Sequence, residues 1–185
     1  MTARVPRGDG IALRAIREAL PLVLSEGYCK PKKGVRVVAV VRDVRAGDLA
    51  GLVGLIGGLA AHHGDTATVR VADLQRDLFG PRPWLFGLVA EEAGRLVGHA
   101  LLFPLAQAQF GSRGMDLHHL FVAEDCRGQG VGRALIDGVL DLATRLGCAY
   151  VAVGTQGENA RAVAVYDAAG FVLRAPGGLR LVKRL

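Results

Sequence analysis

Residues 121–133 read Phe121-Val122-Ala123-Glu124-Asp125-Cys126-Arg127-Gly128-Gln129-Gly130-Val131-Gly132-Arg133, and they join an expected strand to an expected helix. Glycines at 128, 130 and 132 remove side chains where successive backbone N–H groups must converge. The helix begins at this turn with free amides and the positive end of its dipole. Such a turn can hold a pyrophosphate group.

Other glycine-rich phosphate turns have different spacings. A P-loop requires Gly-Lys-Ser/Thr after four intervening residues, and the sequence contains no such run. A dinucleotide turn is spaced Gly-x-Gly-x-x-Gly, whereas this chain has Gly128-x-Gly130-x-Gly132. A P-loop is therefore excluded. A dinucleotide fold and a tight helix entry without a ligand stay as the alternatives.

The stretch resembles the acetyl-coenzyme A motif of the GNAT superfamily of N-acetyltransferases, Arg/Gln-x-x-Gly-x-Gly/Ala. A second signature of that superfamily is matched by Asn159-x6-Tyr166 followed by Ala169-Gly170-Phe171. The two signatures occur in the expected order, and the resemblance covers residues 35–185. Within the superfamily, residues 55–62, 73–79, 88–91 and 178–181 most resemble the spermidine/spermine (diamine) acetyltransferase branch.

The hydrophobic periodicity predicts an α/β (α+β) domain. Helical spacing is expected in residues 49–60, 71–78, 131–146 and 158–169, with a short further helix within 9–26. Strands are expected in residues 35–41, 84–90, 96–105, 116–123, 150–153, 171–174 and 179–185. Together with the resemblance, this pattern implies a GNAT fold: a mixed, mostly antiparallel sheet of six to seven strands flanked by about four helices.

The excess positive charge lies at the start of the chain. Residues 1–45 contain ten lysines and arginines against four acids, which accounts for the whole net charge of +6. Residues 1–34 are therefore expected to be a basic extension and linker, and residues 35–185 the acetyltransferase domain. Because aromatic residues do not interleave with these charges, we expect no nucleic-acid binding.

The cysteines and apolar runs suggest a cytoplasmic protein. Cys29, Cys126 and Cys148 are odd in number and lack the spacing of a zinc or redox site, so reduced thiols and no metal are expected. No apolar run reaches the roughly 20 residues of a membrane-spanning helix.

The resemblance assigns roles to particular residues. Tyr166 corresponds to the general acid that protonates the departing thiolate, and His118 occupies the position of a Glu that serves as base in the diamine branch. The resemblance implies that acetyl-coenzyme A (acetyl-CoA) is held by Leu120, Phe121, Val122, Arg127, Gly128, Gln129, Gly130, Val131, Gly132, Arg133 and Asn159.

Each role has a structural alternative. Tyr166 could be a packed helical tyrosine, and Asn159 could be a helix cap. His118 could lie at a sheet surface or in the core. Since adjacent strand residues face opposite ways, only one of His118 and His119 is expected to face the cleft. Trp84 is expected to pack in the core, and lining of the amine pocket together with Phe110 is the alternative.

These observations support acetylation of a small amine, a diamine or lysine-like compound, by direct transfer in a ternary complex. A peptide or protein amine is the alternative acceptor. A noncatalytic acyl-CoA-binding module and a nucleic-acid binder are the alternatives from other classes. A homodimer is expected, because dimerisation is common in the superfamily that the sequence resembles.

Overall fold

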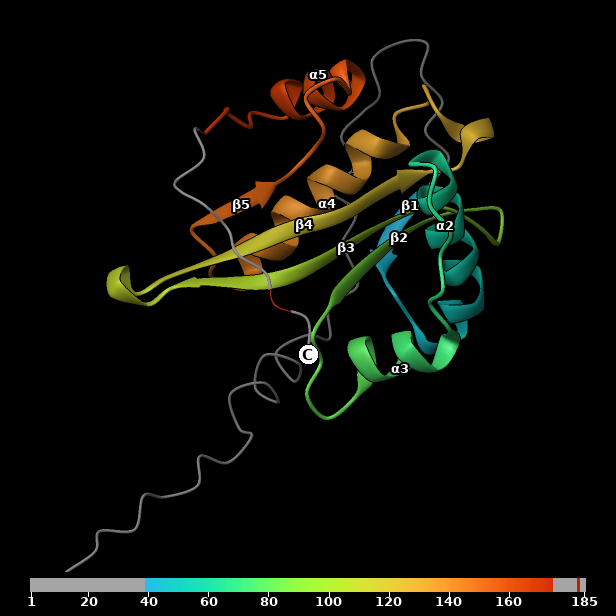
Figure 1. Cartoon of the computed structure of the whole chain (residues 1–185), viewed down its shortest axis with the longest axis horizontal. Helices are drawn as coiled ribbons and strands as arrows, with labels where there is room; N and C mark the ends of the chain where they lie inside the picture. Colours follow the sequence, from blue (N-terminus) through green and yellow to red (C-terminus); the bar gives the residue numbers. More distant parts are fainter. Residues whose placement is uncertain (1–38, 175–182, 184–185) are drawn as a thin grey trace, which may run out of the picture. The chain divides into compact units, whose positions relative to one another are not determined.

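The computed structural model describes residues 39–174 and Lys183, which belong to two compact units divided between Gly154 and Thr155. In chain order the first unit contains β1 (Val40–Asp43), α2 (Leu49–His62), α3 (Val71–Phe79), β2 (Phe86–Glu92), β3 (Arg95–Gln107), β4 (Ser112–Val122), α4 (Val131–Arg145) and β5 (Tyr150–Val153) (Figure 1). The second unit contains α5 (Ala160–Ala168). The boundary expected near residue 35 lies outside the described residues.

The five strands form one mixed sheet in the order β1-β2-β3-β4-β5. The first three pairings are antiparallel, and β4 pairs with β5 in parallel. The predicted mixed, mostly antiparallel α/β architecture is confirmed, but the strand count is five in the part of the chain that the structure describes. Residues 171–174 are irregular, because no strand pairs with them there. The strand expected in 179–185 and the helix expected within 9–26 lie outside the description, apart from Lys183.

Two hairpins connect the central strands. Ala93 and Gly94 both have positive φ, 48° and 80°, which makes the tight turn whose twist suits antiparallel strands between β2 and β3. Strand β4 begins at Ser112, earlier than the sequence predicts. Gly114 makes this early start possible, because the Tyr150 ring of β5 covers it so closely that a Cβ at this position would overlap the ring.

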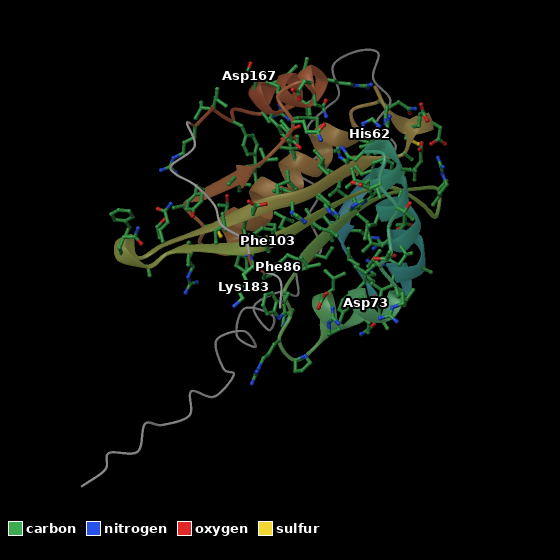
Figure 2. The ribbon with its side chains drawn as sticks, viewed as in Figure 1. His62, Asp73, Phe86, Phe103, Asp167 and Lys183 are labelled. Carbon is green, nitrogen blue, oxygen red and sulfur yellow. The ribbon has the colours of Figure 1, made fainter. Side chains whose placement is uncertain are left out.

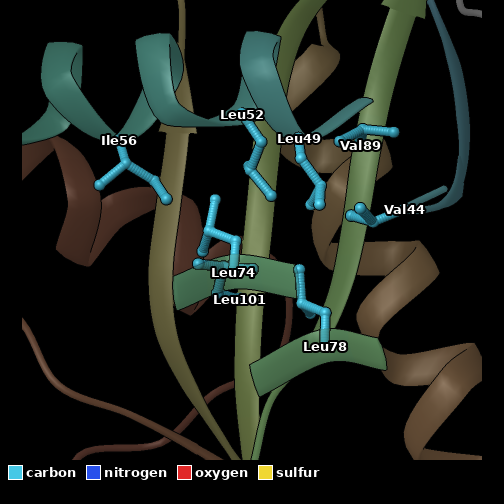
Figure 3. Packing of buried hydrophobic residues seen from close by; sticks show 8 residues of the cluster. All are labelled: Val44, Leu49, Leu52, Ile56, Leu74, Leu78, Val89 and Leu101. Carbon is cyan, nitrogen blue, oxygen red and sulfur yellow. The ribbon is translucent and has the colours of Figure 1, made fainter. Parts of the chain in front are cut away.

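One face of the sheet packs against α2 and α3. Figure 3 shows side chains from both helices converging on Val89 of β2 and Leu101 of β3. The cluster consists of Val44, Leu49, Leu52, Ile56, Leu74, Leu78, Val89 and Leu101, all buried. Their separation from water is the main force that holds these helices to the sheet.

Helix α4 packs on the opposite face. Its apolar stripe is buried as the periodicity predicts, at Val131, Leu135, Val139 and Leu142. Gly138 lets the helix approach β1 and β2 closely, since a Cβ there would lie 2.9 Å from Val41. The helix is therefore fixed with its N-terminus at the end of β4, where the glycine turn lies.

Candidate active site

The glycine turn begins α4 with an unusual backbone. Gly128 and Gly130 have φ of 76° and 87°, a left-handed conformation that residues with a Cβ rarely adopt. Gly130 is the N-cap of α4, and no side chain caps the helix. Gly132 follows inside the first turn, with space around its Cβ position.

The amides of this turn are available to a ligand. Among residues 39–174 and 183, no backbone carbonyl accepts a hydrogen bond from the amides of residues 128–132. The first such bond in the helix runs from the Ala134 amide to the Gly130 carbonyl at 3.0 Å. The turn therefore has the geometry of an anion-binding helix N-terminus.

Side chains fix the turn from both sides. Arg127 Nε donates to the Val122 carbonyl at 3.0 Å, and its guanidinium lies 5.5 Å from the centroid of the Phe121 ring. Gln129 Nε2 donates to the Asp125 carbonyl at 3.0 Å. Arg127 therefore takes up one of the two acceptor lone pairs of the Val122 carbonyl.

The next strand diverges from β4 before the glycine turn. Strand β5 pairs only with residues 114–117 of β4, from Gly114 to Leu117. On the other side, β3 stays paired as far as Val122. Within the described chain, the β5-side edge of residues 118–122 therefore has no strand beside it. Leu120, Phe121 and Val122 lie on this edge, where the sequence predicts the cofactor arm.

A β-bulge lies where the strands diverge. Leu101 pairs with His119 and Leu102 with Leu117, so His118 is the extra residue. The rings of His118 and His119 are stacked at 4.6 Å with planes 16° apart. The two side chains therefore do not point to opposite faces, because the bulge breaks the alternation that the prediction assumed.

The His118 ring is exposed and lies between two rings. His119 stacks on it, and the centroid of Phe103 on β3 is 5.4 Å away (Figure 2 labels Phe103). His119 is half-buried, and burial lowers its pKa to about 4, with further lowering from His118 and His63. His119 is thus neutral near pH 7.

A third histidine lies beneath this pair. His99 on β3 is 0% exposed, and its ring packs edge to face with the His119 ring, with the centroids 6.0 Å apart. Burial lowers the pKa of His99 to about 3, with a smaller effect from His119. In the described part of the chain, no three His, Cys, Asp or Glu side chains form a group suited to a metal ion.

Asn159 and Tyr166 lie in the second unit. Asn159 is the N-cap of α5, and its side-chain oxygen accepts from the Ala162 amide at 3.1 Å. Tyr166 lies in the last turn of α5, and burial raises the pKa of its phenol. The cap role proposed for Asn159 is thus observed, and its side-chain NH2 group is a separate donor.

Glu91, an acid that could have attracted a polycation, is already paired. Glu91 accepts from Arg42 Nε at 2.8 Å, and Arg42 also binds Asp48 at 2.7 Å. This pairing lowers the pKa of Asp48 through its hydrogen bond with Arg42. Trp84 is 75% exposed, so the prediction that it packs in the core is wrong: it follows the turn after α3 and precedes β2.

The Acetyltransferase (GNAT) family pattern matches residues 58–171, and the chain belongs to this family. The chain is 28% identical over 141 residues to a thialysine N-epsilon-acetyltransferase of Bos taurus, covering 71% of this chain and 82% of the relative. Such relatives lie in the diamine acetyltransferase branch, as the resemblance indicated. The protein is therefore a GNAT-family N-acetyltransferase.

Solved structures show the same fold. An aminoglycoside acetyltransferase from an uncultured soil metagenomic sample has a TM-score of 0.68 at 19% identity, covering 79% of this chain and 97% of its own. An integron cassette protein from the mobile metagenome of V. cholerae has a TM-score of 0.67 at 20% identity, covering 80% and 93%. At these identities the similarity establishes the fold alone.

Sequence reasoning did not single out His99 or Phe103. Both lie within the apolar run of β3, where nothing separates them from ordinary strand residues. One signal was present: a lone histidine between Gly98 and Ala100 in a strand that is otherwise apolar must be buried or paired.

Proposed function

We propose that this protein uses acetyl-CoA to acetylate a primary amine of a small diamine or lysine-like compound, by direct transfer in a ternary complex. The observation that carries the proposal is the glycine turn, with left-handed Gly128 and Gly130 and unengaged amides at the N-terminus of α4. The name of the thialysine relatives supports a lysine-like acceptor.

In this proposal the turn holds the pyrophosphate of the cosubstrate. The contributing residues are Arg127, Gly128, Gln129, Gly130, Val131, Gly132 and Arg133. The free edge of β4 at Leu120, Phe121 and Val122 holds the pantetheine arm. In the second unit, the resemblance assigns a further cofactor contact to the Asn159 side chain. Acetyl-CoA supplies an activated thioester.

Two side chains move protons. The acceptor nitrogen bonds to the acetyl carbon while the carbon–sulfur bond breaks. His118 accepts the proton released by the amine, because a neutral imidazole is a suitable base near pH 7. Tyr166 donates its phenolic proton to the thiolate, and its raised pKa keeps that proton in place at neutral pH.

The pairing of carboxylates favours an acceptor of low positive charge. Glu91 and Asp48 are bound by Arg42, and Asp125 is bound by Arg95 at 2.6 Å. A polyamine of several charges would need unpaired acids to replace its hydration. A single lysine-like amine has no such requirement.

Calorimetric titration of acetyl-CoA tests the cofactor site. Gly132→Glu places a carboxylate in the first turn of α4, where the backbone is helical and a Cβ meets only Val122 Cγ2 at 3.7 Å. We expect Kd to rise at least tenfold, about 1.4 kcal/mol, while the matched Gly132→Ala control stays near wild type. Equal binding by the Glu variant would remove the pyrophosphate assignment, and no binding by wild type would remove the proposal.

The location and assembly belong to the same proposal. No helix in the described ranges is both long enough and apolar enough to cross a membrane. Cys126 and Cys148 are both free thiols, which suits the reducing cytoplasm. A homodimer is expected from the family, and sedimentation velocity at two protein concentrations distinguishes it from a monomer.

A further inference from the structure

His99 is the only polar side chain in the described core that is completely buried. Neither of its ring nitrogens has a hydrogen-bond partner among residues 39–174 and 183. A neutral imidazole carries one donor and one acceptor, and leaving such groups unpaired in the interior is costly. Buried polar groups of this kind are normally satisfied by protein or by ordered water.

His119 presents a third unpaired nitrogen beside it. Its Nδ1 is buried and has no partner in the same residue ranges. The two ring centroids are 6.0 Å apart, with planes at 77°. Edge packing of the rings alone would leave all three nitrogens unsatisfied. The titratable groups that act on these rings are His118 on β4 and His63 after α2, both acting on His119, and His119 acting on His99.

We propose that a buried water site lies between His99 and His119, and that His99 thereby acts as a positioning residue for the histidine pair at the bulge. A water molecule there accepts a hydrogen bond from the N–H of one ring and donates to the lone pair of the other. Such a site is polar and offers the two or more partners that an internal water needs.

The shared water couples the tautomers of the two rings. A neutral imidazole carries one ring proton, so a hydrogen bond that fixes whether Nδ1 of His119 holds this proton also fixes whether Nε2 does. The His118 ring stacks directly on His119, so the orientation of His119 determines that of His118. The consequence for proton transfer rests on the proposed function, whereas the water site and the tautomers do not.

Nitrogen-15 NMR of the imidazole rings in the full chain tests the water and the tautomers. We expect His99 and His119 of the wild type each to show one fixed neutral tautomer, with a cross-peak from a ring N–H to a long-lived water. His99→Leu should average the tautomers of His119. His99→Asn or His99→Gln, which keep a donor and an acceptor, should restore a single one.

His62→Ala is the matched control, because among the described histidines the ring of this exposed residue contacts only that of His63 (Figure 2 labels His62). It should leave the His119 signals unchanged. An unchanged His119 tautomer in folded His99→Leu, or a wild type without the water cross-peak, would overturn the proposal. If His99→Leu does not fold, the wild-type cross-peak and the two carboxamide variants decide.

Kinetics provide a separate readout. In His99→Leu we expect kcat/KM for the amine to fall roughly tenfold, as for the loss of one buried hydrogen bond. We also expect the acid limb of its pH profile to shift. KM for acetyl-CoA should not change, and the carboxamide variants should recover the rate. An inactive wild type with the NMR result intact would count against the proposed function alone.

Discussion

The Ala169-Gly170-Phe171 signature has a structural role around Tyr166. Gly170 ends α5 in a left-handed conformation with φ of 88°. The Gly170 amide donates to the Asp167 carbonyl at 2.9 Å and the Phe171 amide to the Tyr166 carbonyl at 3.0 Å. This helix end places the Phe171 ring against Tyr166, with centroids 5.7 Å apart. The signature thus holds the proposed acid by packing.

Tyr166→Phe should lower kcat by about 10²-fold or more, because the ring still packs on Phe171 while the proton donor is lost. KM for acetyl-CoA should stay near the wild-type value. Steady-state kinetics of thiol release measures both constants.

Tyr150→Phe is the control for this variant. It keeps the ring that covers Gly114 and removes only a hydroxyl. Wild-type turnover by Tyr166→Phe would contradict the acid role. Because burial raises the pKa of Tyr166, the alkaline limb of the wild-type kcat profile should lie above the usual phenol value and disappear in the variant.

Helix α2 contains four glycines that do not have the same role. A Cβ at Gly54 would meet no atom within 4 Å, whereas one at Gly58 would lie 2.8 Å from the Phe121 ring. Gly58 is thus what allows β4 and α2 to approach at the start of the glycine turn. Gly54 lowers helix stability without a packing contact to compensate.

Alanine substitutions in α2 should therefore have opposite effects. We expect Gly54→Ala to stabilise the fold by about 0.5–1 kcal/mol, because alanine favours the helix. Gly58→Ala should destabilise it by about 1–3 kcal/mol through overpacking against Phe121. Urea denaturation of both variants measures the difference, and the same sign for both would contradict this account.

The elements were predictable where local periodicity sets the structure. Strand β5 and the starts of α2, α3 and α4 were predicted correctly, since each shows a clear apolar pattern with Gly or a polar turn beside it. The early start of β4 was not, because Ser112, Arg113 and Gly114 are typical of a loop and become a strand only through Tyr150. Similarly, Val172 and Leu173 have strand propensity but no partner strand in the described chain.

The local geometry of the proposed site was predictable to the extent that it depends on short motifs. The glycine turn and the helix end at Tyr166 each consist of residues close together in the chain, so sequence motifs identify them. The stacked histidines depend on the pairing of β3 with β4, which local sequence does not reveal. Their arrangement required the register shift at His118.

The whole molecule should lose stability on mild acidification. The pKa of His99 is about 3 and that of His119 about 4 when folded, against about 6.5 for an unfolded histidine. As pH falls below about 6.5, the unfolded chain binds protons that the folded chain refuses, so the free energy of unfolding decreases. At pH 5 the contribution of His99 to this decrease is about 2 kcal/mol, because pH 5 lies about 1.5 units below the pKa of an unfolded histidine.

Thermal unfolding at pH 7, 6 and 5 measures this slope. His99→Gln should show a smaller decrease in Tm over the same range. Carboxylates with lowered pKa, such as Asp48, act mainly below pH 4 and do not obscure the histidine window. A Tm independent of pH between 7 and 5 would show that these rings are solvated in the folded protein.

The bulge at His118 also reverses the parity of β4. In a regular strand, side chains two residues apart share a face, so His119 and Phe121 would lie on the face of Leu117. Because His118 is an extra residue, they lie on the α2 face instead. A substitution at His118 changes one ring, whereas deleting that position would remove the bulge and leave Leu117, His119 and Leu120 as consecutive residues on the faces that they already occupy. The pairing of β3 with β4 up to the glycine turn would thus survive the loss of this residue, whereas the stacked histidine pair would not.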